Sequence, residues 1–214
     1  MFSPAYGIFL LPAFFNIRPV KFPLFSVWVC LFLAPVSRAF PADPPDLVVA
    51  DFEGDSYGAW QAEGEAFGFA PARGTLPGQQ KVTGFEGQGL VNTFLKGDRS
   101  TGTLTSPPFT LERPYLRFLI GGGKSAEKTA LLLEVDGQVV RTATGPNAPN
   151  APGGTERLET DYWDVREFAG KKAVLRIVDQ ATGGWGHLNV DQIVQTAQRP
   201  TRMAPASQIG RAHV

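Results

Sequence analysis

The sequence of 214 residues contains little cysteine and histidine, and each scarcity excludes a class of chemistry. Its single cysteine, Cys30, lies in an apolar stretch near the amino terminus, so the rest of the chain has neither a thiol nucleophile nor a disulfide. Of its two histidines only His187 lies outside the last few residues, which argues against a zinc site built from several histidines. The GGGK at 121–124 lacks the leading glycine of a phosphate loop. No complete catalytic motif of these kinds is present.

The chain has too few basic residues to indicate that its binding partner is an anionic polymer. Residues 40–196 hold 20 acidic and 14 basic side chains, a net charge of about −6. Phosphate neutralisation dominates nucleic-acid binding, so a mildly acidic chain without a basic stripe excludes nucleic acid as the expected partner. Neutral ligands or cations suit this charge better.

The sequence has no apolar run long enough to cross a bilayer as a helix. Its amino-terminal run at 24–33 has ten residues, against about 20 for a membrane span. Basic residues precede the run, and SRA, with small residues at the two positions that a signal peptidase inspects, follows it. We expect a signal peptide at 1–39, a linker at 40–46 and an exported protein without a membrane anchor after cleavage.

The carboxyl-terminal residues 197–214 form a polar tail with no strand or helix pattern. Its last six residues read IGRAHV, which is one translation of a common sequencing adapter. The pattern indicates that the reading frame leaves native sequence between 198 and 209. We therefore expect the chain to be an amino-terminal fragment of a longer protein.

Residues 47–196 show no sustained helical period. Short runs rich in β-branched and aromatic residues alternate instead with Gly, Pro, Asn and Asp, which is typical of strands in a sandwich or barrel. We expect strands at 47–53, 65–69, 90–95, 102–111, 115–120, 130–135, 138–144, 156–162, 172–179 and 188–195. The predicted fold is an all-β, jelly-roll-like sandwich of the galactose-binding type.

Two tight connections and one longer loop can be predicted from the local sequence. Asp136 and Gly137 readily adopt positive φ angles, so the flanking runs should form a tight hairpin. WDVREFAGKK, at 163–172, is expected to contain one helical turn, and the Gly-, Pro- and Asn-rich residues 145–154 should form a mobile surface loop.

The segment 181–194, ATGGWGHLNVDQIV, holds the strongest candidate for ligand binding. Sugar recognition needs an aromatic face for the apolar side of the ring and planar polar groups for its hydroxyls. Trp185 stands among glycines and is followed by His187 and Asn189, which fits that need. A Trp among glycines can equally close the end of a core, and the sequence leaves both interpretations open. Further candidate ligand residues are Arg73, Asn92, Arg141 and Tyr57, with salt bridges, surface positions or the core as their alternatives.

Calcium is the metal that the sequence favours. Oxygen-rich sites in secreted sandwiches commonly form where the first and last strands meet, and Glu53 and Asp191 lie in those strands. A turn-capping role for Asp191, or an ion pair with an arginine, is an equal alternative. A structural Ca²⁺ held by Glu53 and Asp191 is thus an open expectation.

Five segments in order resemble the accessory β-sandwich of bacterial glycoside hydrolase family 32 levanases and inulinases, a domain similar to carbohydrate-binding module family 38. They are 51–68 (DFEGDSYGAWQAEGEAFG), 71–79 (PARGTLPGQ), 89–123, 131–147 and 177–195 (IVDQATGGWGHLNVDQIVQ). The resemblance implies a non-catalytic module for inulin or levan, attached to a carboxyl-terminal propeller hydrolase that this chain lacks. The hydrolase motifs W-x-N-D-P-N-G, R-D-P and E-C do not occur here. The alternative is a structural sandwich that packs against the hydrolase without binding sugar.

Overall fold

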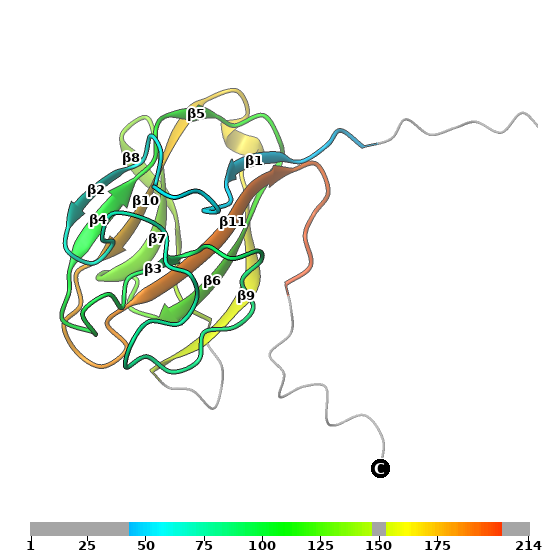
Figure 1. Cartoon of the computed structure of the whole chain (residues 1–214). Helices are drawn as coiled ribbons and strands as arrows, with labels where there is room; N and C mark the ends of the chain where they lie inside the picture. Colours follow the sequence, from blue (N-terminus) through cyan, green and yellow to red (C-terminus); the bar gives the residue numbers. More distant parts are fainter. Residues whose placement is uncertain (1–42, 147–152, 203–214) are drawn as a thin grey trace, which may run out of the picture. The chain divides into compact units, whose positions relative to one another are not determined.

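The computed structural model describes residues 43–146 and 153–202 (Figure 1). The predicted signal peptide, part of the linker, most of the 145–154 loop and the end of the tail lie outside these residues. Two antiparallel sheets form a sandwich, which confirms the predicted all-β class. Within 43–146 and 153–202, no helix is both long and apolar enough to cross a membrane.

The first sheet carries the candidate site. Its strands, in spatial order, are β1 (Leu47–Ala50), β11 (Leu188–Thr196), β6 (Tyr115–Gly123) and β9 (Gly154–Asp164), with β3 (Val91–Asn92) beside the start of β11. The second sheet has the order β2 (Gln61–Gly64), β4 (Gly102–Thr105), β10 (Lys172–Asp179), β7 (Thr129–Val135) and β8 (Gln138–Ala143), with β5 (Phe109–Thr110) beside β10.

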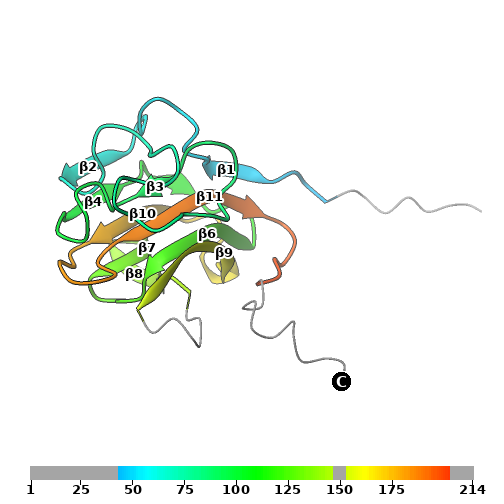
Figure 2. The ribbon, with the colours of Figure 1, turned by 60° about the horizontal axis from the view of Figure 1, so that its bottom comes forward.

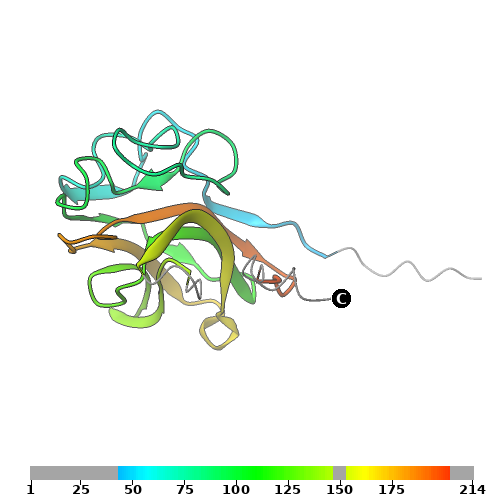
Figure 3. The same cartoon turned by 90° about the horizontal axis from the view of Figure 1, so that it is seen from below.

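The main core lies between the sheets, and a second core lies on the outer face of the first sheet. Leu188 and Val190 of β11 point into the main core, so the intervening Asn189 points to the outer face. A covering segment, residues 72–90, crosses that outer face, as the loops above β11 show in Figures 2 and 3. Its apolar contact with the sheet is a small cluster of Val82, Leu90, Leu119 and Leu158. Polar side chains of the outer face are therefore buried beneath the covering segment.

The two predicted connections are confirmed. The β7–β8 hairpin turns at Asp136 (φ 53°) and Gly137 (φ 74°), both in the left-handed region that a tight two-residue hairpin requires. The expected helical turn is the 3₁₀ turn η1 (Arg166–Phe168).

Four predicted strands are wrong in position or extent. The strand expected at 47–53 ends at Ala50, so Glu53 lies outside it. The strand expected at 65–69 lies instead at β2, because Gly64 (φ 81°) turns the chain and sends Ala66 and Phe67 into the core. The strand expected at 102–111 is divided into β4 and β5 by Pro107 and Pro108, which have no N–H for the ladder. The run expected at 90–95 pairs only as the two-residue β3.

Both ends of the described sandwich lie at one end of the first sheet. β1 and β11 are antiparallel neighbours, with Leu47 opposite Gln195, so the residues before β1 and after β11 lie together. The tail is tied to β9, since Arg199 donates a 2.7 Å hydrogen bond to the Tyr162 hydroxyl. The loop with Trp185 precedes β11 and therefore lies at the opposite end of that strand.

Candidate functional site

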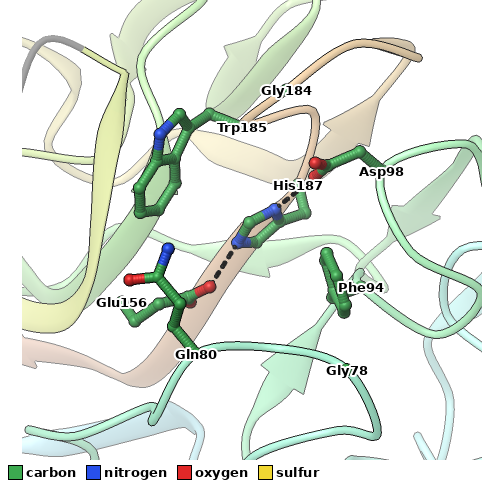
Figure 4. Close-up of a pocket in the computed structure, with 8 residues that line it drawn as sticks. All are labelled: Gly78, Gln80, Phe94, Asp98, Glu156, Gly184, Trp185 and His187. Atoms are coloured by element: carbon green, nitrogen blue, oxygen red, sulfur yellow. Dashed lines mark hydrogen bonds and ion pairs between the residues drawn. The ribbon is translucent and has the colours of Figure 1, made fainter.

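A pocket opens at the end of the first sheet where β11 begins. Its volume is about 230 Å³, somewhat below the roughly 300 Å³ at which typical small-molecule sites begin. Figure 4 shows its lining, which consists of Gly78, Gln80, Phe94, Asp98, Glu156, Gly184, Trp185 and His187. The pocket thus combines three aromatic rings with two carboxylates and one amide.

Three consecutive glycines of β6 allow the backbones around the pocket to come close. Gly122 has a φ of 94°, and a Cβ there would lie 2.5 Å from the carbonyl oxygen of His187. A Cβ on Gly123 would overlap the carbonyl oxygen of Trp185. The Gly-rich run at 121–123 therefore lets β6 approach the loop that carries Trp185 and His187.

His187 joins two carboxylates beneath the pocket. Its Nδ1 lies 2.7 Å from Asp98 and its Nε2 lies 3.0 Å from Glu156, while the ring is 3% exposed. Burial by itself would lower the pKa of His187, but the hydrogen bonds and charges of Glu156 and Asp98 outweigh it and raise the pKa. The arrangement favours an imidazolium that donates both N–H groups.

Glu156 extends this network under the covering segment. Its second carboxylate oxygen accepts hydrogen bonds from Asn189 (2.8 Å) and from the side chain of Gln79 (3.0 Å). Gln79 in turn accepts a 2.8 Å hydrogen bond from Asn92. The network fastens the covering segment to β3, β9 and β11, so its buried members hold the pocket in shape.

Trp185 forms one wall of the pocket. It is a bulky residue with a φ of 61°, a backbone conformation rare outside glycine. The indole stacks on His187, with ring centroids 5.6 Å apart and planes at 24°, and remains half-buried. On the opposite side of His187, Phe94 meets the imidazole edge to face at 4.9 Å. The imidazole is thereby held between two rings, and part of the indole stays open to the pocket.

A further buried acid lies near this network. Asp179, at the end of β10, is fully buried, and burial raises its pKa to about 6 despite the favourable charge of His187. One of its carboxylate oxygens has no hydrogen-bond partner among the described residues. Asp179 is thus a second group whose protonation is coupled to the site.

We predict that the sandwich is less stable at pH 8 than at pH 5, because three of its buried ionisable groups have raised pKa values. Burial raises the pKa of Asp179 to about 6 and of Asp191 to about 7, and the pKa of His187 is raised by its two carboxylates. Such groups bind more protons when folded, so their stabilisation is lost as the pH rises from the unfolded through the folded pKa. Urea unfolding at both pH values measures the difference.

Asp179→Asn is the matched variant for this prediction. The amide has the same shape and no charge, so we expect a gain in stability at pH 8, at most about 3 kcal/mol, and little gain at pH 5. An equal gain at both pH values, or a wild type whose stability does not change with pH, would contradict the prediction.

The two residues predicted to hold calcium lie near each other beside the covering segment. Glu53 accepts hydrogen bonds from the backbone N–H groups of Gln88 (3.0 Å) and Gly89 (2.9 Å), and Asp191 accepts one from Glu86 (2.8 Å). Among residues 43–146 and 153–202, no group of three or more His, Cys, Asp or Glu residues is arranged to hold a metal ion. These backbone donors take up oxygens that a cation would need, so calcium binding stays a prediction for titration to test.

The other predicted ligand residues divide into two groups. Trp185, His187, Asn189 and Asn92 are brought together, although only Trp185 and His187 line the pocket. Arg73 instead contacts Asp55 and the backbone of Glu53, and Arg141 pairs with Glu167 at the η1 turn. Tyr57 is a correction: it is 8% exposed and its hydroxyl donates to the carbonyl of Phe67, so it belongs to the core.

Sequence reasoning missed Glu156, Asp98, Gln80 and Phe94. They lie on β9 and on two loops, from 31 to 107 positions before His187, so no local pattern links them to it. One signal was available, since a histidine expected in a buried strand region needs polar partners. The sequence did not show which carboxylates supply them.

Comparison with known proteins finds a curated relative in Aspergillus rugulosus, named "Putative glycosyl hydrolase ecdE". The two sequences are 45% identical over 158 residues, which are 72% of this chain and 22% of that protein. The chain is thus similar to one segment, about a fifth, of a much longer protein. No protein-family model matches the chain.

Solved structures with some likeness include the K1 cleaved adhesin domain of Lys-gingipain from Porphyromonas gingivalis W83. It is 16% identical with a TM-score of 0.45, over 73% of this chain and 100% of that domain. A family 35 carbohydrate binding module from an environmental isolate is 18% identical with a TM-score of 0.33, over 65% and 99%. Likenesses this weak carry no argument about the ligand of this chain.

Proposed function

We propose that this sandwich is a non-catalytic sugar-binding module of a secreted glycoside hydrolase, and that the pocket beside Trp185 is its binding site. The observation that carries the proposal is the half-buried indole that lines a pocket together with carboxylate and amide groups. The similarity of this chain to a segment of a protein named as a putative glycosyl hydrolase supports the proposed link to such an enzyme.

In the proposed site, the exposed residues of the pocket contact the sugar, and the buried residues hold them in position. A sugar ring would stack its apolar face on the open part of the Trp185 indole, while its hydroxyls would donate hydrogen bonds to Asp98 and exchange them with the amide of Gln80. Asp98 is suited to this role because its side chain is 27% exposed and His187 holds it from behind. His187, Glu156 and Asn189 act as positioning residues.

Fructan, of the inulin or levan type, is the proposed ligand class. The five segments that resemble the family 32 accessory sandwich support this choice, and a neutral polysaccharide suits the acidic charge of the domain. A module of this kind raises the local concentration of its enzyme on the polymer, so modest affinity is enough.

Titration calorimetry of the chain against inulin, levan and a glucan tests this proposal. We expect saturable binding to a fructan and about a tenfold loss in Trp185→Ala, because aromatic stacking contributes about 0.5–1.5 kcal/mol beyond the burial of apolar area. Tyr115→Ala is the matched control, since Tyr115 pairs with Thr196 at the opposite end of β11. Its affinity should equal that of the wild type.

The alternative is a sandwich that only packs against the hydrolase. The observation in its favour is an exposed apolar patch formed by Phe69 and by Leu95, which lies against the neighbouring Gly68. A folded chain that binds none of these polysaccharides would overturn the sugar-binding proposal and leave this packing role.

A further inference from the structure

A second hollow lies on the other side of Trp185. Its volume is about 320 Å³, and its lining consists of Lys124, Ser125, Gly153, Ala181, Gly183, Gly184 and Trp185. Trp185 and Gly184 line both hollows. The indole therefore stands as a partition between two neighbouring depressions of one surface.

The two hollows differ in chemistry. The first contains the carboxylates of Asp98 and Glu156, whereas the second contains the ammonium of Lys124 and the hydroxyl of Ser125. Lys124 is half-buried and forms no ion pair within the described parts of the chain. An ammonium with three N–H donors and a hydroxyl suit the oxygens of a neutral sugar.

The backbone of Gly183 and Gly184 forms a ridge between the two hollows, called here the glycine ridge. Among the described residues, a Cβ on Gly183 or on Gly184 would meet no atom within 4 Å. Beside these glycines, Trp185 keeps its left-handed backbone, a conformation that costs of order 1–3 kcal/mol and tends to occur at functional sites. That conformation places the indole between the hollows.

From this geometry we infer that the site binds at least two consecutive rings of a neutral oligosaccharide, one in each hollow. The inference rests on the proposed function and deepens it. The terminal ring lies in the smaller, acid-walled pocket, and the next ring crosses the glycine ridge and lies against Lys124 and Ser125. Trp185 contacts both rings with the part of its indole that His187, Gly153 and Gly154 leave open.

The test is calorimetric titration of the chain with fructose, inulobiose and inulotriose. We expect the affinity to rise about tenfold or more from one ring to two and much less from two to three. The double variant Lys124→Ala/Ser125→Ala should reduce the two-ring affinity to the one-ring value and leave fructose binding unchanged. Asp98→Asn should weaken all three ligands.

Lys128→Ala is the matched control, because Lys128 is an exposed lysine of the same loop that lies outside both hollows. Its affinities should equal those of the wild type. Equal affinity for fructose and inulobiose, or unchanged inulobiose binding in the double variant, would overturn the two-hollow inference while leaving the module a sugar binder. No binding of any of these sugars or of the polysaccharides would overturn the proposed function itself.

Discussion

Replacing His187 with alanine is expected to lower the free energy of unfolding by about 3–5 kcal/mol, because it leaves a buried carboxylate without its cation. Glu156 is 7% exposed and accepts a hydrogen bond from His187 Nε2. The substitution also removes the ring that packs between Phe94 and Trp185. Urea unfolding at pH 6 measures the loss.

A partial rescue separates the charge effect from lost packing. Glu156→Gln in the His187→Ala background removes the stranded charge and keeps an oxygen for Asn189 and Gln79, so part of the stability should return. The exposed ion pair of Lys96 and Glu65 supplies the comparison: Lys96→Ala should cost less than about 1 kcal/mol. A His187→Ala loss no larger than that of Lys96→Ala would show that the buried pair contributes little.

Substituting Gly123 with alanine should cost about 3 kcal/mol and abolish sugar binding. The added methyl group overlaps the backbone carbonyl oxygen of Trp185, which cannot rotate away as a side-chain end would. Either β6 or the Trp185 loop must then shift, and both border the pocket. Thermal unfolding and titration with inulin measure the two effects.

Gly183→Ala is the matched control, since a methyl group there meets no atom within 4 Å. Its stability should stay within about 0.5 kcal/mol of the wild type. If Gly123→Ala behaved like Gly183→Ala, the close approach of β6 to the Trp185 loop would not be needed for the fold.

The sandwich was predictable because its strands alternate and its turns carry Asp-Gly, Gly and Pro. The errors occur where single residues override the pattern: Gly64 ends a strand early, and Pro107 with Pro108 divides another. The covering segment was not predicted, because its contact with the sheet involves only a few apolar residues without a regular period.

The candidate site was predictable in part. Trp185, His187 and Asn189 lie within five consecutive residues, and the local pattern indicated their role. Asp98 and Glu156 could not be found, because sheet pairing and the course of the loops bring them to His187. The role of Gly121, Gly122 and Gly123 could not be predicted for the same reason. The backbone segments that these glycines allow to come close to β6 are distant in the sequence.

The adjacency of the two ends has a mechanical consequence. A force that pulls apart the residues before β1 and after β11 acts in an unzipping direction, because these strands are antiparallel neighbours whose outer ends lie together. Their hydrogen bonds then break one after another from Leu47 onward, which requires less force than shearing them all at once. The Trp185 loop lies at the far end of β11 and is loaded last.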